Sequence, residues 1–86
     1  MTETEQGSYF VYIVQCRDGT LYTGFTTDVL QRVARHNAGK GARYTRSRRP
    51  VTLVYSCGYF SKSVAMRQEA RIKRLTRKEK EVLICS

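Results

Sequence analysis

The chain has 86 residues and a formal net charge of +9, from 16 Lys and Arg against 7 Asp and Glu. This length is that of one domain, and it excludes a two-domain enzyme with a separate cofactor-binding half. The aromatic content of 10% excludes a disordered basic tail, which would have few aromatic residues. The excess of positive charge predicts a polyanionic partner, which is either nucleic acid or an anionic membrane surface.

A membrane is the weaker of these two options. No apolar run approaches the roughly 20 residues that a helix needs to cross a bilayer. The first seven residues are acidic and polar, unlike a signal peptide or a basic anchor. We therefore expect a cytoplasmic protein that binds nucleic acid and no membrane. The three cysteines lack the spacing of a zinc site, and we interpret Cys16 and Cys57 as small apolar residues on strands.

The N-terminal part of the chain predicts a β-hairpin. Residues 1–8 are interpreted as a flexible tail, and residues 9–86 as a single domain. Residues 9–16 (YFVYIVQC) are an apolar run rich in strand-forming residues, which predicts a buried strand. An Asp-Gly pair then predicts a tight turn before a returning strand over residues 21–25. Gly24 within that strand indicates a bulge, or the close approach of a ligand or another backbone.

The middle of the chain predicts a helix followed by a basic loop. Asp28 is a suitable N-cap residue, and Gln31 completes a capping-box pattern with it. Gly39 is expected to end this helix. Residues 40–49 (KGARYTRSRR) follow as a loop with five cations and one aromatic residue. The helix residues expected to face the core are Val29, Leu30, Val33 and Ala34.

The C-terminal part predicts one more strand and two helices. Residues 51–59 form the strand, and Ser61 or Ser63 is expected to start the first helix. Thr76 and Glu79 form a capping box that opens the second helix. This order of elements predicts an α+β fold, in which a small three-stranded antiparallel sheet is packed by helices. The core-facing residues of the first of these helices are expected to be Ala65, Ile72 and Leu75.

The distribution of charge singles out one acidic residue. Between Asp28 and Glu79 the chain has 14 Arg or Lys and a single acid, Glu69. A solvated helix face usually mixes both signs, so this isolated carboxylate needs an explanation. An ion pair with Lys73, four residues further along the helix, is the structural alternative to a functional role.

Four further residues are expected to gather near the hairpin. Tyr12 and Tyr22 lie on the two predicted strands and can share one face of the sheet. Arg32 and His36 are four residues apart, so they share a helix face. Each alone has an ordinary explanation as a packed aromatic, a solvated cation or a helix-end charge. Taken together with Glu69, they predict a site that binds a phosphate group, because an arginine can donate to two phosphoryl oxygens at once.

The basic loop over residues 40–49 contains no acid. We expect it to contact the phosphate backbone rather than to read bases, with its tyrosine available for stacking on a base. A solubilising loop is the alternative. The residues predicted to bind nucleic acid are Lys40, Arg43, Tyr44, Arg46, Arg48 and Arg49.

The order of these residues resembles a known family. The segments FVY at 10–12 and YTG at 22–24, followed by Arg32 and Glu69, are similar to the pattern of the GIY-YIG nucleases. The resemblance covers most of the chain and is nearest to the small stand-alone bacterial branch of that superfamily. It implies a metal-dependent phosphodiesterase on a small three-stranded scaffold.

The resemblance also implies a role for each residue of the site. Glu69 matches the glutamate that binds a single divalent cation, Mg²⁺ or Mn²⁺, and Gly24 matches the glycine of the second motif. Either Tyr22, with a phenol pKa lowered from about 10 by Arg32 and the metal, or His36, which titrates near neutrality, can serve as the general base. The residues at the matching catalytic positions are Tyr12, Tyr22, Arg32 and His36.

The chain departs from the family pattern at three points. Phe10 replaces the glycine of the first motif, Thr23 replaces an isoleucine, and the asparagine near the C-terminus of many members has no counterpart. Two main hypotheses follow. The first is a nuclease, expected to be a monomer, that selects DNA or RNA by structure rather than sequence, for example in DNA repair. The second is a nucleic-acid-binding module with little or no catalysis. A basic adaptor for a protein partner is a third and weaker one.

Overall fold

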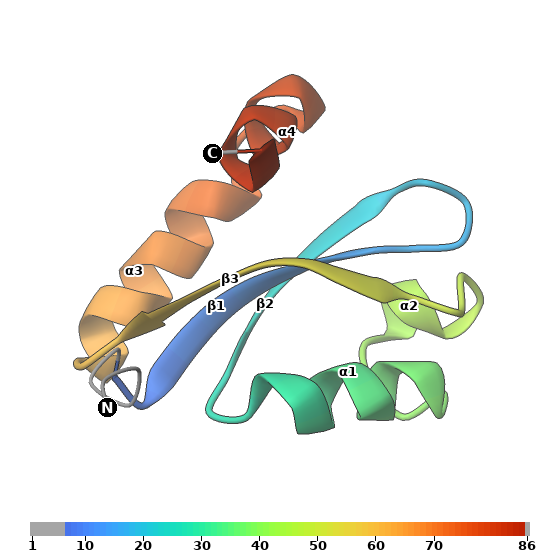
Figure 1. Cartoon of the computed structure of the whole chain (residues 1–86), viewed down its shortest axis with the longest axis horizontal. Helices are drawn as coiled ribbons and strands as arrows, with labels where there is room; N and C mark the ends of the chain where they lie inside the picture. The colour runs from blue at the N-terminus through green and yellow to red at the C-terminus, as the bar shows by residue number, and fades with distance from the viewer. Residues whose placement is uncertain (1–6, 86) are drawn as a thin grey trace.

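The computed structural model describes residues 7–85 and forms three strands and four helices over that range (Figure 1). The strands make one antiparallel sheet in the order β2-β1-β3, so the predicted α+β fold with a three-stranded sheet is confirmed. In chain order the elements are β1 (Tyr9–Gln15), β2 (Leu21–Thr26), α1 (Val29–Asn37), α2 (Arg43–Arg46), β3 (Thr52–Tyr59), α3 (Lys62–Lys73) and α4 (Arg77–Cys85).

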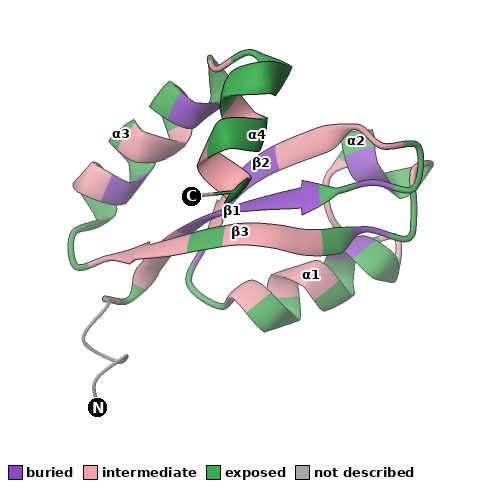
Figure 2. Ribbon diagram, turned by 45° about the horizontal axis from the view of Figure 1, so that its top comes forward, coloured by how far each residue is buried: buried purple, intermediate pink, exposed green. Residues whose placement is uncertain are grey.

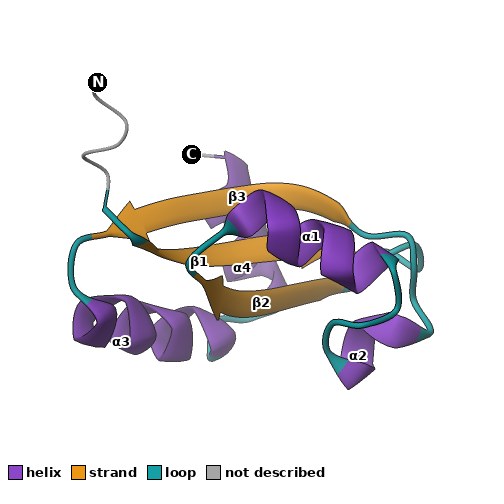
Figure 3. Cartoon of the chain, turned by 90° about the horizontal axis from the view of Figure 1, so that it is seen from below, coloured by secondary structure: helices purple, strands orange, loops and turns teal. Residues whose placement is uncertain are grey.

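Helices cover both faces of the sheet, with α1 and α2 on one face and α3 and α4 on the other (Figure 1). The central strand β1 is therefore buried over most of its length (Figure 2). Val11 and Ile13 pack against Ala65 and Ile72 of α3. A second cluster of core residues, which includes Tyr12, packs against α1. Figure 3 shows α1 lying over the strands of the sheet. Coverage on both faces explains why β1 is a continuous apolar run instead of an alternating one.

Helix α1 buries a narrower stripe than the sequence predicts. Val29 and Val33 pack against the core, as expected. Leu30 is 78% exposed and Ala34 is also exposed, so the prediction that they face the core is wrong. Each follows a packed residue directly, and one step along a helix turns the side chain by about 100°, away from the sheet.

The ends of α1 show how local chemistry fixes its length. The Asp28 carboxylate accepts a hydrogen bond from the Gln31 amide at 3.1 Å, which confirms the predicted cap. The reciprocal bond expected from the Gln31 side chain is replaced, because the Asp28 amide donates to the Thr26 hydroxyl at 3.1 Å. After α1 ends at Asn37, Gly39 adopts a φ of +80°, a left-handed conformation that favours glycine.

The basic segment that follows α1 contains a short helix, where the sequence predicts only a loop. α2 covers four residues, and Thr45 within it is fully buried. Its Oγ1 lies 2.7 Å from Nδ1 of His36 on α1. The segment thus folds back onto α1, and a polar contact between distant residues sets its shape.

The two C-terminal helices begin where the sequence places their caps. The Ser61 hydroxyl accepts from the Val64 amide at 3.4 Å and starts α3. The Glu79 amide donates to the Thr76 hydroxyl at 3.1 Å, and the Thr76 amide donates to the Glu79 carboxylate at 2.8 Å. This reciprocal pair confirms the predicted capping box at the start of α4.

The predicted N-terminal tail is described only in part. Residues 1–6 lie outside the described residues. Ser8 lies against the end of β3, because its amide donates to the Tyr59 carbonyl at 3.1 Å. Across residues 7–85, no helix has the length and apolar character needed to span a membrane.

Candidate active site

Strand pairing brings two tyrosines onto one face of the sheet. Tyr12 pairs with Gly24, and Val14 pairs with Tyr22, so Tyr12 and Tyr22 are diagonal neighbours on the face covered by α1. His36 of α1 lies against both of them. Its ring centroid is 5.9 Å from that of Tyr12 and 5.4 Å from that of Tyr22, in edge-to-face geometry. Three of the predicted catalytic side chains therefore meet.

Two glycines make room for this cluster. Gly24 lies opposite Tyr12, and a Cβ atom at Gly24 would overlap the Tyr12 hydroxyl and ring. A Cβ atom at Gly41 would likewise overlap the His36 imidazole. The group that approaches Gly24 closely is the side chain of Tyr12 on the neighbouring strand, where the sequence predicts a bulge, a ligand or another backbone.

A chain of hydrogen bonds runs through the buried part of the site. The Tyr12 hydroxyl is 2.8 Å from Nε2 of His36, and Nδ1 of His36 is 2.7 Å from Oγ1 of Thr45. Thr45 uses its single hydroxyl proton to donate to the Ala42 carbonyl at 3.0 Å. The threonine oxygen must therefore accept from Nδ1–H of His36, and Nε2 must accept from Tyr12. The network assigns His36 the Nδ1–H tautomer.

The pKa shifts of Tyr12 and His36 agree with that assignment. Burial raises the pKa of Tyr12 to about 12, and a hydrogen bond from the Arg32 side chain opposes part of the rise. Burial also lowers the pKa of His36, and the positive charge of Arg32 lowers it further. Tyr12 and His36 are both 1% exposed, and at neutral pH both are uncharged. A buried pair of neutral groups joined by a hydrogen bond avoids the cost of an unpaired charge.

Arg32 and Tyr22 face a pocket beside this chain. The pocket has a volume of about 270 Å³, and no acidic residue lines it. The Arg32 guanidinium is held by a bond from its Nη1 to the Phe25 carbonyl at 3.3 Å and by its contact with Tyr12. Cations and phenols around one cavity favour an anion such as a phosphate group. The lining residues are Tyr12, Tyr22, Arg32, Arg35, His36, Lys40, Gly41 and Ala42.

Glu69 lies apart from this pocket, on α3. Its Oε2 is 3.3 Å from Nζ of Lys73, so the i to i+4 ion pair is present, and the Glu69 side chain is only 17% exposed. The carboxylate is still close enough to raise the pKa of Tyr12, as the smallest of several effects. Within the described range, no group of three or more His, Cys, Asp and Glu gathers as a metal cluster.

The chemistry of Glu69 fits Mg²⁺ better than a metal that needs several protein ligands. Mg²⁺ keeps several waters and often uses one or two carboxylates together with substrate phosphates. Oε1 of Glu69 has no hydrogen bond or ion pair to the rest of residues 7–85. One oxygen of a largely buried carboxylate is thus available as a ligand without loss of the Lys73 contact.

Two residues of the basic segment 40–49, Tyr44 and Arg48, pack in sequence behind Tyr22. The Tyr44 ring stacks against Tyr22 with centroids 5.9 Å apart, and the Arg48 guanidinium lies 4.0 Å from the centre of the Tyr44 ring. Nε of Arg48 donates to the Asp18 carboxylate at 3.1 Å. Hydrogen bonds from Thr20, followed by the contact with Arg48, lower the pKa of Asp18. Tyr44 and Arg48 therefore support Tyr22, and the stacking of Tyr44 on a base stays a prediction.

The other predicted nucleic-acid residues are distributed around this segment. Lys40 lines the pocket of Tyr22, while Arg46 and Arg49 line a second one near the hairpin turn. Arg43 is exposed on α2. Asn37 lies outside the tyrosine pocket, because its side-chain amide bonds to the backbone of Val51 at 2.7 and 3.1 Å.

Sequence reasoning missed Thr45, Gly41 and Arg35. Thr45 contacts His36 from nine residues away and across a loop, a distance at which no periodic pattern operates. The signal available for Gly41 is the Gly-Lys-Gly segment, in which two glycines so close together indicate tight backbone packing.

The chain is similar to a known protein family and to individual proteins. A family profile described as the GIY-YIG catalytic domain matches residues 8–82. A UPF0213 protein of Halobacterium salinarum is 60% identical over 75 residues, which cover 87% of this chain and 97% of that protein. A UPF0213 protein of Staphylococcus haemolyticus is 57% identical over 76 residues, which cover 88% and 93%.

Two solved structures are also similar to this chain. A solution NMR structure of a UPF0213 protein from Bacillus halodurans shares 49% identity with a TM-score of 0.59, over 90% of this chain and 82% of that one. A solution NMR structure of a protein from E. faecalis shares 42% identity with a TM-score of 0.62, at the same coverage.

Proposed function

We propose that this chain, which belongs to the GIY-YIG catalytic domain family, is a metal-dependent nuclease that hydrolyses phosphodiester bonds in DNA or RNA. One observation carries the proposal. A buried hydrogen-bond chain through His36 fixes Tyr12 beside Arg32, and Arg32 and Tyr22 face a cationic pocket of about 270 Å³. Selection of substrates by structure fits a domain of 86 residues, because its basic residues suit contacts to the backbone.

Arg32 is the residue that binds the scissile phosphate. Its guanidinium is always charged, and it can donate to two phosphoryl oxygens as negative charge develops on them. Tyr12 acts as a positioning residue, because its hydroxyl contacts Arg32 on one side and His36 on the other. Lys40 at the rim of the same pocket adds positive charge.

Tyr22 is a better candidate than His36 for the group that orients the attacking water and, after its own phenol proton has left to solvent, takes a proton from that water as a phenolate. Both ring nitrogens of His36 are already hydrogen-bonded, and its lowered pKa disfavours protonation. Tyr22 is half-buried and lines the pocket, and its hydroxyl makes no hydrogen bond within residues 7–85. Glu69 would hold a divalent cation such as Mg²⁺ or Mn²⁺. That cation would acidify water and stabilise charge on the phosphate.

A second candidate function is nucleic-acid binding with little or no hydrolysis. It is favoured by the position of Glu69, which is outside the lining of the pocket and already paired with Lys73. Phe10 and Thr23 at two motif positions support it as well.

The two candidates are separated by a panel of nicked, flapped, branched and single-stranded substrates, in DNA and RNA, with Mg²⁺ and Mn²⁺ titrations. For the nuclease, we expect Glu69→Gln and Arg32→Gln to lose activity by about 10²-fold or more. Glu81→Gln is the matched control, because Glu81 also pairs with a cation four residues away on an exposed helix surface, and it should keep full activity.

Equal cleavage by the wild type, Glu69→Gln and Arg32→Gln would overturn the proposed mechanism. Salt-sensitive binding without cleavage under either metal would support the second candidate instead.

A further inference from the structure

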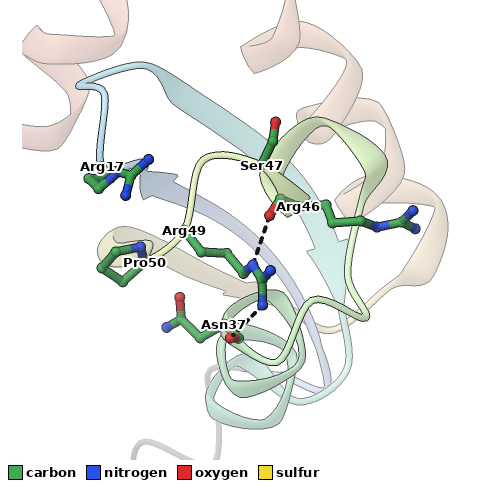
Figure 4. Close-up of a pocket in the computed structure, with 6 residues that line it drawn as sticks. All are labelled: Arg17, Asn37, Arg46, Ser47, Arg49 and Pro50. Atoms are coloured by element: carbon green, nitrogen blue, oxygen red, sulfur yellow. Dashed lines mark hydrogen bonds between the residues drawn. The ribbon is translucent and has the colours of Figure 1, made fainter.

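A second concave surface lies at the end of the molecule that holds the hairpin turn. It has a volume of about 410 Å³ and is built from the turn after β1, the ends of α1 and α2, and the segment between α2 and β3 (Figure 4). Three of its six lining residues are arginines, and none is acidic. The lining residues are Arg17, Asn37, Arg46, Ser47, Arg49 and Pro50.

Hydrogen bonds hold the walls of this pocket in place. The Arg17 amide donates to the Arg48 carbonyl at 2.9 Å, which ties the hairpin to the opposite wall. Arg49 donates from Nε to the Arg46 carbonyl at 2.7 Å and from Nη1 to the Asn37 carbonyl at 3.5 Å. Its guanidinium also lies against Gly39, where a Cβ atom would come within 2.8 Å of Nη1. The site is thus largely preformed, which lowers the cost of binding.

Several hydrogen-bond donors of the pocket have no acceptor among the described residues. The Arg17 side chain has no hydrogen bond or ion pair to the described part of the chain, and Arg49 retains the two N–H donors of Nη2. In Figure 4 the Arg46 side chain extends away from Arg17 and Pro50, so Arg46 contributes its carbonyl to the wall and its charge to the field. The nearby Asp18 carboxylate is engaged by Arg48 and Thr20.

We propose that this pocket, through Arg17 and Arg49, binds a backbone phosphate of the nucleic acid other than the one that is hydrolysed. The proposal rests on nucleic acid as the partner in the proposed function. His36 lines the first pocket and Asn37 the second, so both pockets adjoin the last turn of α1. A nucleic-acid strand that reaches both is held at two points, which sets its direction across Tyr22.

The test compares Arg17→Gln with Arg74→Gln, which removes the same charge from an exposed position at the end of α3, outside both pockets. Binding of a labelled nicked duplex is followed by fluorescence anisotropy as salt is raised from about 50 mM to about 200 mM. Loss of one phosphate contact should lower the slope of log Kd against log salt by about 0.9 in Arg17→Gln. The wild type should then lose roughly threefold more affinity than Arg17→Gln over this range, and Arg74→Gln should behave as the wild type.

A second readout separates this inference from the nuclease proposal. Hydrolysis of bis(p-nitrophenyl) phosphate requires the pocket of Tyr22 and the cation at Glu69 but not the second pocket, because this substrate has a single phosphodiester. Arg17→Gln should leave its turnover unchanged and raise KM for the duplex severalfold. If neither substrate is cleaved but the salt slope still falls in Arg17→Gln, the nuclease proposal fails and the phosphate site stands.

Three results would overturn the inference. The first is an equal salt slope in Arg17→Gln, Arg74→Gln and the wild type. The second is equal loss of turnover on both substrates in Arg17→Gln. The third comes from NMR signals of the Arg17 and Arg49 side chains. If inorganic phosphate saturates their shifts while the duplex leaves them unmoved, the pocket binds a free anion.

Discussion

The buried hydrogen-bond chain can be tested by removing a single hydroxyl at Thr45. Thr45→Val keeps nearly the same shape but removes the acceptor for Nδ1–H of His36 and the donor to the Ala42 carbonyl. His36 is 1% exposed, so water cannot replace the lost partner. A shift of the proton to Nε2 does not help, because Nδ1 would then be an unpaired acceptor. An unsatisfied buried group costs about 1–3 kcal/mol of unfolding free energy.

Thr23 provides a matched control with the opposite expected sign. It is also a buried threonine, 3% exposed, but its Oγ1 has no hydrogen-bond partner within residues 7–85. Thr23→Val should therefore stabilise the protein by about 1 kcal/mol, because it removes a buried and unpaired hydroxyl from a strand that favours valine. The two variants are expected to differ by about 2–4 kcal/mol.

Urea and thermal unfolding measure this difference directly. For a domain of this size, each kcal/mol moves Tm by about 4–8 °C, so the two variants should lie on opposite sides of the wild type. The His36 nitrogen shifts should also show the Nδ1–H tautomer in the wild type and a disturbed state in Thr45→Val. Equal effects of the two substitutions on stability would refute the reasoning, since the hydrogen bonds of Thr45 would then carry no net free energy.

Three further predictions concern the same region. The free energy of unfolding should fall as pH drops from about 7.5 to about 5.5, because His36 in the unfolded chain takes up a proton near its ordinary pKa of 6.5 while burial keeps its pKa in the folded protein lower. A urea midpoint that is constant with pH would contradict this, and so would a dependence of that midpoint on pH that is the same in His36→Gln as in the wild type. Gly24→Ala should cost about 1–3 kcal/mol in equilibrium unfolding, because the added methyl group overlaps Tyr12. Asn37→Ala should cost about 1–2 kcal/mol in the same assay by removing both bonds to Val51, and Asn37→Asp should recover part of it by keeping the acceptor, so equal losses would rule out a role for that acceptor.

The parts of the fold that the sequence predicts well are those fixed by neighbours in the chain. The caps at Asp28 and Ser61 and the reciprocal pair of Thr76 and Glu79 each join residues three apart. Such contacts depend on residue types that can be recognised locally. The apolar run of β1 is equally informative, because burial on both faces leaves no alternation to interpret.

The parts that the sequence does not predict depend on contacts between distant segments. Thr45 becomes buried only because the segment after α1 folds back over His36. The same folding engages Tyr44 with Tyr22, 22 residues earlier in the chain. Leu30 fits a helical pattern of apolar residues but is exposed. The small sheet is covered at this point by its neighbour Val29, which packs against the core instead. Periodicity can locate a helix, but it cannot tell how wide a surface the sheet presents to it.

The positive field that attracts a polyanion also determines which groups of the site can change charge near neutral pH. Burial lowers the pKa of His36 and the positive charge of Arg32 lowers it further, so a second positive charge beside the pocket of Tyr22 is disfavoured. The charges that remain around the pocket of Tyr22 are those of Arg32, Arg35 and Lys40. Attraction of phosphate by these charges should therefore depend little on the protonation of His36 near neutral pH. A pH dependence of hydrolysis near neutral pH, measured where the protein remains folded, would then report on the proposed transfer of a proton from the attacking water. If His36→Gln shows the same dependence of hydrolysis on pH as the wild type, His36 is not the general base. That variant therefore separates a role of His36 in proton transfer from a role in positioning Tyr12.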